Sequence, residues 1–330
     1  MDGILNILKP PGMTSFDVVA HLRGLLGTRK IGHAGTLDPL AVGVLPVCVG
    51  RATRAIEFLM DKNKYYRAEL TLGVVTDTQD STGQVLSTTE PVCSDEEIIV
   101  SVHSFSGIYH QLPPMYSALK VDGKRLYELA RTGVEVERQR RIVEVYSADV
   151  IQIDRSAGVK VLMDVKCSKG TYIRTLCADI GERLSCGGHM SFLLRKRAGP
   201  FDISDAYTLE ELAEKHRDGT IQAVLLGVDK VFDNMPRYTL EENSNKKFAN
   251  GMNIPIPAGT FPDDSGCMGR QSTESTTSPG CMGGQSTEST TSPGNGSRLV
   301  RVYGSDGGFV AIGIVKSNET GSFLKVKKFF

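Results

Sequence analysis

One acidic residue, Asp38, lies between a glycine-containing segment and an apolar run in the stretch GHAGTLDPLAVGVLP, residues 32–46. The three glycines of this stretch permit backbone angles that other residues resist, so another group can approach the chain closely. Pro39 restricts the backbone directly after the acid and suits the first position of a helix, for which Asp38 would be an ordinary N-cap. The stretch predicts either such a cap or a carboxylate held rigidly between apolar walls, which strengthen its electrostatic contacts.

Size and charge limit the classes of protein that fit. The chain has 330 residues, enough for one large domain and a smaller one, and its 40% hydrophobic and 23% charged residues are ordinary for a globular protein. The formal net charge is +0, so no global basic field indicates a nucleic-acid partner, and RNA binding would have to depend on local clusters. Three basic clusters occur, at residues 138–141, 195–197 and 325–328.

The seven cysteines bear on the redox compartment. Their number is odd and no Cys-x-x-Cys pair occurs, which argues against a disulfide framework and against a structural zinc site. Reduced thiols suit the cytosol, and we find neither a signal-peptide pattern nor an apolar run of membrane-spanning length. These features predict a soluble, cytoplasmic protein.

Hydrophobic periodicity predicts both helices and strands. Helices are expected after three sets of N-capping residues, at positions 14–15, 94–97 and 208–211. Strands are expected where apolar and polar residues alternate, at positions 64–72 and 159–168. Tyr66 belongs to the apolar face of the first of these strands, where an ordinary core tyrosine is the plainest interpretation.

A tandem repeat interrupts the C-terminal part of the chain. Residues 267–280 (CMGRQSTESTTSPG) reappear almost unchanged as residues 281–294. The repeat is rich in Ser, Thr and Gly, and it has too few large apolar residues to offset the entropy of ordering. We expect a disordered insertion at residues 263–297.

Several segments together resemble a known enzyme family. The run GHAGTLDPLAVGVLPVCVG is followed by Arg51 and Arg54, KPPGMTS precedes it, and KGTYIR follows at residues 169–174. These motifs, in this order, resemble those of the TruB family of tRNA pseudouridine synthases, in its bacterial form. The resemblance covers residues 3–229 strongly and the remainder weakly.

The resemblance implies an α+β fold. The catalytic domain, residues 1–229, is expected to have a central mixed or antiparallel β-sheet flanked by helices and loops. A segment at about residues 107–146 would grip the RNA with basic and aromatic side chains. Residues 230–330 would form a small β-rich, PUA-like RNA-binding domain, interrupted by the repeat.

The resemblance also assigns roles to catalytic residues. Asp38 would be the catalytic acid, and Arg174 would pair with it and keep it ionised, because a guanidinium stays charged and binds carboxylates in a planar fork. Tyr66 would be the active-site tyrosine, placed to remove a proton from C5 of the uracil. Tyr172 would pack on the base, and His33 would help to displace the target nucleotide.

Further residues are expected to contact the substrate. Asp80, in a segment that resembles the family pattern T-D-T-x-D-x-x-G, would contact the active-site arginine or the RNA. Leu193 would be an apolar contact to the bound nucleotide and Arg195 a phosphate contact. Lys9, in the KPPGMTS segment, is grouped with these RNA-binding residues.

The implied reaction isomerises a uridine in the T-arm loop of tRNA, at position 55, to pseudouridine. The target flips out of its stack, the N1–C1′ bond breaks, and C5 bonds to C1′. Whether Asp38 attacks C1′ or removes the C2′ proton to give a glycal stays open. No cofactor or metal is expected, and tRNA is the partner of a monomer that needs no other protein.

Two alternative functions stay open. One is an RNA-binding module, a tRNA-folding chaperone for which catalysis is secondary. The other is a guide-RNA-dependent pseudouridine synthase that works with protein partners.

Overall fold

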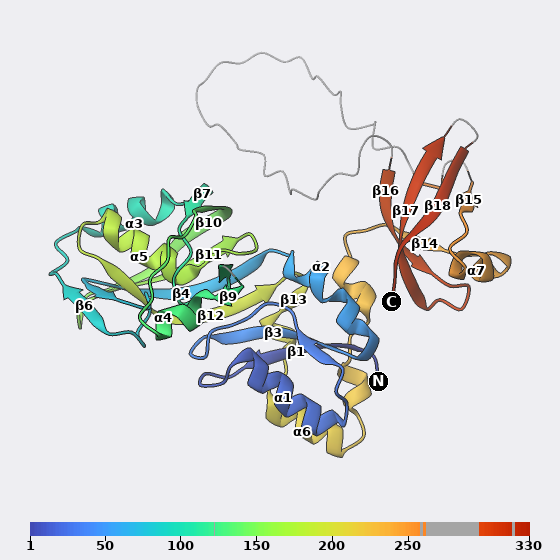
Figure 1. The fold of residues 1–330 in the computed structure, drawn as a ribbon, viewed down its shortest axis with the longest axis horizontal. Helices are drawn as coiled ribbons and strands as arrows, with labels where there is room; N and C mark the ends of the chain where they lie inside the picture. The colour runs from blue at the N-terminus through green and yellow to red at the C-terminus, as the bar shows by residue number, and fades with distance from the viewer. Residues whose placement is uncertain (122, 258–259, 262–296, 319–320) are drawn as a thin grey trace, which may run out of the picture. The chain divides into compact units, whose positions relative to one another are not determined.

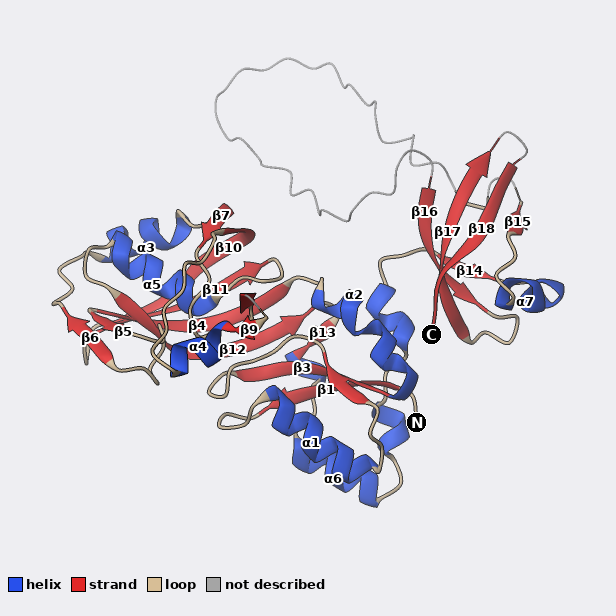
Figure 2. Ribbon diagram, in the orientation of Figure 1, coloured by secondary structure: helices blue, strands red, loops and turns tan. Residues whose placement is uncertain are grey.

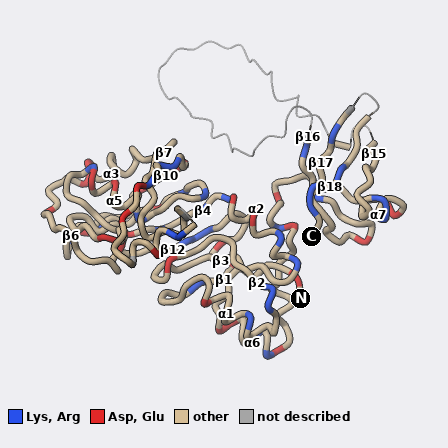
Figure 3. The backbone as a smooth tube through the Cα atoms, viewed as in Figure 1, with Lys and Arg blue, Asp and Glu red and all other residues tan. Residues whose placement is uncertain are grey.

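The computed structural model describes residues 1–121, 123–257, 260–261, 297–318 and 321–330, and the tandem repeat lies outside these ranges. The chain divides into two compact units, Met1–Leu226 and Gly227–Phe330 (Figure 1). Figure 3 shows acidic and basic residues interspersed along the described chain of both units rather than segregated by sign.

A nine-stranded sheet forms the centre of the first unit, with the main order β1-β3-β12-β4-β11-β10-β7. Most neighbours are antiparallel, but β12 pairs in parallel with β3, so the sheet is mixed. β2 pairs with β3, and β13 pairs with β12. The strands are β1 (Gly3–Lys9), β2 (Ile31–His33), β3 (Val42–Val49), β4 (Lys64–Leu72), β7 (Gly107–Gln111), β10 (Arg141–Asp154), β11 (Val159–Cys167), β12 (Gly188–Ala198) and β13 (Phe201–Asp202).

Helices and two small hairpins surround this sheet (Figure 2). The α-helices are α1 (Ser15–Leu26), α2 (Ile56–Met60), α3 (Asp95–His103), α4 (Leu126–Arg131), α5 (Ile173–Arg183) and α6 (Leu209–Arg217). Short 3-10 helices lie at Gly50–Ala55, Ile203–Asp205, Ile221–Val224 and Val228–Phe232, the last of them in the second unit. The hairpins pair β5 (Val74–Thr76) with β6 (Val85–Thr88), and β8 (Lys120–Val121) with β9 (Lys124–Arg125).

The predicted helix starts are confirmed. Complete capping boxes begin α1, α3 and α6, with Thr14, Ser94 and Thr208 as the N-cap residues. In each box the N-cap hydroxyl and an acidic side chain three residues later satisfy backbone donors that have no partner inside the helix. A helix after Asp38 is not formed, because the chain makes a turn there and enters β3 at Val42.

Two apolar cores lie against the sheet. Ala68, Leu70 and Leu72 alternate inward along β4 as predicted, and they pack with Leu176 and Ile180 of α5. The second core joins β1 and β3 to helices α1 and α6. Tyr66 and Leu37 belong to the first core. Residues 34–41, which connect β2 to β3 and are called the Asp38 loop below, therefore lie at its border.

The second unit is a small β-rich domain. Its five-stranded sheet has the order β14-β16-β17-β18-β15, and its core contains Phe248, Val300 and Leu324. The last three strands of the chain pair consecutively as antiparallel neighbours. The elements are β14 (Arg237–Thr239), α7 (Glu242–Ala249), β15 (Ile254–Ile256), β16 (Ser297–Tyr303), β17 (Phe309–Asn318) and β18 (Gly321–Phe329).

Candidate active site

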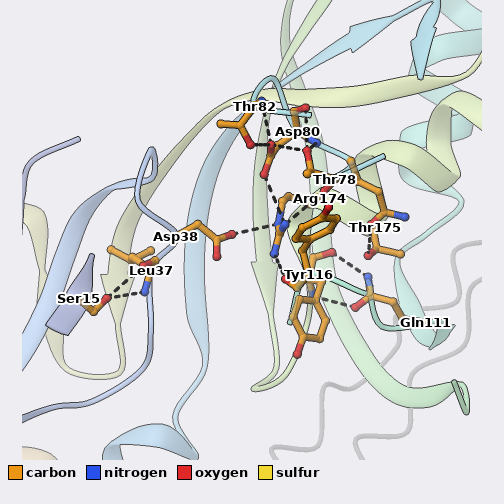
Figure 4. A network of polar contacts seen from close by, with 12 residues as sticks. Ser15, Leu37, Asp38, Thr78, Asp80, Thr82, Gln111, Tyr116, Arg174 and Thr175 are labelled. Carbon is orange, nitrogen blue, oxygen red and sulfur yellow. Dashed lines mark hydrogen bonds and ion pairs between the residues drawn. The ribbon is translucent and has the colours of Figure 1, made fainter. Parts of the chain in front are cut away.

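An ion pair between Asp38 and Arg174 is the centre of the site. Nε of Arg174 lies 3.0 Å from Oδ2 of Asp38, as the resemblance implies (Figure 4). Arg174 is the second residue of α5, which begins where the KGTYIR segment leaves β11. The side chain of Arg174 is 7% exposed and that of Asp38 is 40% exposed. The Asp38 side chain is therefore only partly open to solvent, and its counter-charge is buried.

The remaining donors of Arg174 are also bound. Nη1 lies 3.4 Å from Oδ2 of Asp80 and donates to the carbonyl of Thr78 at 3.2 Å. Nη2 donates to the carbonyl of Tyr116 at 2.9 Å. Because a guanidinium is planar and its donors have fixed directions, these contacts determine where Nε points. Arg174 is thus held rigidly toward Asp38.

Asp80 is held by its own turn. Its Oδ1 atom accepts from the Thr78 hydroxyl at 2.7 Å and from the backbone N–H of Thr82 at 2.9 Å. Gln79, directly before it, has a φ of +62°, which is uncommon for a residue other than glycine. The Gln79 side chain accepts a 2.8 Å hydrogen bond from Thr175 on α5, which connects the turn to the helix of Arg174.

Opposing influences act on the Asp38 carboxyl. Burial raises its pKa above the ordinary value of 3.8, and the Arg174 guanidinium opposes that rise. The carboxylate of Asp80 adds to the rise, and Lys9 opposes it. Arg174 is the strongest of the groups that favour the ionised form, so its charge and its distance decide how much carboxylate is present.

Side chains from α1 and β1 support the backbone of the Asp38 loop. The hydroxyl of Ser15 accepts from the Leu37 N–H at 2.9 Å and donates to the Leu37 carbonyl at 3.2 Å. Nζ of Lys9 donates to the carbonyls of Pro39 at 3.1 Å and Ala41 at 2.7 Å. The residues on both sides of Asp38 are therefore fixed by groups far from them in sequence.

The predicted RNA contact of Lys9 is wrong in this structure. Lys9 is 0% exposed, and its ammonium group also donates to the carbonyl of Pro10 at 2.8 Å. Burial lowers its pKa to about 8, against the opposing influence of Asp38. Lys9 thus supports the loop from inside the protein.

The predicted phosphate contact of Arg195 is also not supported. Arg195 is 1% exposed, and its guanidinium donates to the carbonyl of Val44 at 2.7 Å and to that of Gly35 at 3.1 Å. A guanidinium enclosed in this way does not reach a phosphate outside the protein. The resemblance implied a phosphate contact for Arg195, but side chains alternate along a strand, and in β12 the side chain of Arg195 points inward.

Gly43 allows β3 to approach β12 closely. It has a φ of +111° and is paired with Arg195 where the two strands run parallel. A Cβ atom at this position would lie 2.2 Å from the Arg195 carbonyl oxygen. Only glycine fits both the backbone angle and the space, which explains the third glycine of the motif.

Gln111 is a site residue that the sequence analysis missed. Its side-chain amide accepts from the Tyr172 N–H at 2.7 Å and donates to the Tyr172 carbonyl at 2.8 Å, and the residue is 1% exposed (Figure 4). It thus holds the backbone of the residue directly before α5. The only signal in the sequence was its position at the end of a short strand, before two prolines.

The other predicted residues lie around this centre. Tyr66 and Leu193 are buried, at 8% and 7% exposed, and share an apolar cluster with Leu37. Burial raises the pKa of Tyr172, and Arg174 and Asp38 are among the charges that act on it. Burial lowers the pKa of His33, and its Nδ1 atom is buried with no hydrogen-bond partner among the described residues. Burial therefore favours the neutral form of the His33 ring.

In the part of the chain that the structure describes, no group of three or more His, Cys, Asp and Glu residues is placed to hold a metal ion. No helix found there has both the length and the apolar character needed to cross a membrane.

Comparisons with known proteins identify the family to which these motifs belong. The profile of the TruB family pseudouridylate synthase N-terminal domain matches residues 23–173, and that of the tRNA pseudouridylate synthase B C-terminal domain matches residues 174–233. The chain is 52% identical over 254 residues to tRNA pseudouridine synthase B of Alkaliphilus oremlandii (strain OhILAs), covering 77% of this chain and 83% of that protein. It is 45% identical over 263 residues to the protein of that name from Geobacillus thermodenitrificans (strain NG80-2), covering 78% and 87%.

Solved structures show the same fold. The crystal structure of a Cbf5-Nop10-Gar1 complex contains a chain that aligns with a TM-score of 0.67 and 26% identity, over 99% of this chain and 84% of that one. A chain of the archaeal box H/ACA sRNP Nop10-Cbf5 complex aligns with a TM-score of 0.64 and 25% identity, covering 99% and 85%. Fold and site together define an α+β isomerase of the pseudouridine synthase class. The chain belongs to the TruB family of pseudouridylate synthases.

Proposed function

We propose that this chain converts the uridine at position 55, in the T-arm loop of tRNA, to pseudouridine. The observation that carries the proposal is the Asp38–Arg174 ion pair, in which a partly exposed carboxylate is backed by a buried guanidinium. The relatives named tRNA pseudouridine synthase B support tRNA as the substrate. The position within tRNA follows from the resemblance of the motifs to the bacterial form of the family.

The site residues suit a nucleotide that has left its stack. A uridine inside a folded loop must flip out before its sugar reaches Asp38, which costs a few kcal/mol of unstacking. The neutral ring of His33 would occupy the vacated space, and Tyr172 and Leu193 would contact the flipped base. Apolar walls exclude water, so uracil that has left C1′ is retained beside it.

Asp38 would act on the sugar and Arg174 would keep it ionised. The carboxylate either bonds to C1′ or removes the C2′ proton, and both routes require the charged form. Because burial raises the pKa of Asp38, the buried guanidinium of Arg174 is needed to maintain that form near neutral pH. Tyr66 would take the C5 proton after the base has re-bonded.

The second unit and the segment at residues 107–146 would hold the rest of the tRNA. The segment carries Lys124, Arg125 and Tyr127, with the Arg125 guanidinium 5.8 Å from the Tyr127 ring centroid. We propose that the second unit, the five-stranded domain with helix α7, is a PUA-like RNA-binding domain. The chain would act as a monomer in the cytoplasm, where tRNA is found, without a cofactor.

The experiment is incubation of the purified chain alone with an unmodified tRNA transcript, followed by mass-spectrometric mapping of pseudouridine. We expect modification at position 55 only. Modification elsewhere would contradict the assigned position, and no modification without an added guide RNA and proteins would favour the guide-dependent alternative. Rescue of tRNA folding by an inactive Asp38→Asn variant would measure any separate chaperone activity.

A further inference from the structure

Tyr66 and Arg195 are directly opposite each other on neighbouring strands. β4 and β12 are antiparallel, and Tyr66 is the pairing partner of Arg195 in their register. Side chains at such positions leave the sheet on the same face with Cβ atoms about 4.5–5.5 Å apart. Both residues are buried, at 8% and 1% exposed. A phenol and a guanidinium are therefore neighbours inside the protein, beneath the Asp38 loop.

The guanidinium of Arg195 makes its hydrogen bonds to neutral groups. Nε and Nη2 donate to the carbonyls of Val44 and Gly35, while the Asp38 carboxylate is bound by Arg174. A buried cation that is not neutralised by a carboxylate is costly. A structural anchor for two carbonyls does not need that charge, since a neutral amide donor could serve the same carbonyls. The buried positive charge of Arg195 therefore indicates a role beyond holding these two carbonyls.

We infer that Arg195 is a positioning residue that stabilises the ionised form of Tyr66 while the tyrosine transfers the C5 proton. This inference rests on the proposed function. It assigns to Arg195 a task in the second half of the reaction, after the glycosidic bond has broken, whereas Arg174 serves Asp38 in the first half.

The N1–C1′ bond breaks with its electron pair left on uracil, and C5 then bonds to C1′. C5 still carries its hydrogen, and N1 lacks one. The Tyr66 hydroxyl gives its proton to N1, and the resulting phenolate accepts the proton from C5, so the electron pair of the C5–H bond restores the ring double bond. Tyr66 ends as it began, and Arg195 faces the phenolate that exists in between.

The groups around Tyr66 agree with this role. Burial raises the pKa of the Tyr66 phenol above its ordinary value of 10, and Arg195 is the strongest influence that opposes the rise. Asp38, from the loop, and Cys167, from β11, act in the opposite direction. Arg195 is thus the nearby cation that favours a phenolate in an otherwise apolar environment.

The test uses the full chain and tRNA transcribed with either ordinary or C5-deuterated uridine. Single-turnover pseudouridine formation is measured for wild type, Arg195→Gln and Arg195→Lys. The Arg195→Gln variant keeps donor groups but loses the charge. We expect it to react roughly 10- to 100-fold more slowly at pH 7.5. Its deuterium isotope effect should be clearly larger than that of wild type, because proton removal from C5 now limits the rate.

Two controls separate this role from a structural one. An Arg195 that only supports the loop would slow bond cleavage, so both isotopes would react at equal rates in the variant, and that result would overturn the inference. If Arg195→Gln does not fold, Arg195→Lys decides, because it keeps a charge but loses the planar guanidinium. An isotope effect larger than that of wild type supports the inference, and one equal to that of wild type overturns it.

Whether wild type forms pseudouridine at all tests the proposed function, independently of the role of Arg195. An active wild type whose variants react equally with both isotopes would leave the proposed function intact and remove only the role of Arg195.

Discussion

Arg174 Nε lies 3.0 Å from Asp38 Oδ2, yet the two side chains differ greatly in exposure, at 7% and 40%. Their pairing joins the first residues of α5 to the loop before β3. The buried partner is fixed by two backbone carbonyls and a second carboxylate, so the exposed partner is placed by a rigid support rather than by its own strand.

Replacing Arg174 by lysine should reduce single-turnover pseudouridine formation by roughly 100-fold while leaving tRNA affinity within a few-fold of wild type. A lysine keeps the charge but cannot bind Asp38, Asp80 and two carbonyls in one plane. The matched control is Arg183→Lys, an exposed position on the same helix, which should behave as wild type. Full activity of Arg174→Lys would show that the planar fork is not needed.

Asp38→Asn should abolish pseudouridine formation and, at pH 7, should make the protein no less stable than wild type. Because the folded-state pKa of Asp38 is raised above 3.8, the folded protein binds the extra proton more readily than the unfolded chain does. The ionised Asp38 therefore lowers stability above its folded-state pKa, and this loss disappears as the pH falls toward and below 3.8.

Urea unfolding of wild type and Asp38→Asn at pH 7 and at pH 4 measures this effect. The free-energy advantage of the variant should be largest at pH 7 and smaller at pH 4. An advantage that grows on acidification would mean that the pKa of Asp38 is lowered, contrary to the structure.

Gln111→Leu should lower the activity and destabilise the first unit by about 1–3 kcal/mol, because it leaves the N–H and carbonyl of Tyr172 without their partner. Gln111→Glu keeps an acceptor for the N–H and should fall between leucine and wild type in activity. Gln152→Leu, at an exposed position of β10, is the control for the same change in side chain. Calorimetry and single-turnover assays measure the two effects; equal behaviour of the two leucine variants would refute the role of Gln111.

Gly43→Ala should destabilise the protein by about 2 kcal/mol or more and reduce activity, since it combines a left-handed backbone with a Cβ atom 2.2 Å from the Arg195 carbonyl oxygen. Gly24→Ala in α1 is the matched control, because nothing lies within 4 Å of its Cβ position. That change should stabilise slightly, by roughly 0.5–1 kcal/mol, as alanine favours a helix. Thermal unfolding measures the change in stability of both variants relative to wild type. Similar changes in the two variants would contradict the strain predicted at Gly43.

The sequence was informative where local chemistry decides the structure. Capping residues such as Ser94 and the alternation around Leu70 predicted helices and strands correctly, because these signals act over a few residues. The resemblance of the motifs also gave the α+β class, the family and the pair of Asp38 with Arg174.

Tertiary structure alone decided what each buried polar side chain does. The resemblance assigned Lys9 and Arg195 to contacts with RNA, yet strand pairing places both inside the protein. There Lys9 donates to the carbonyl of Ala41, and Arg195 donates to that of Gly35. Gln111 gave almost no signal, because its partner is the backbone of Tyr172, and every residue has the same backbone groups. Burial and hydrogen-bond partners depend on which distant segments meet in space, and for that reason these roles appear only once the chain is folded.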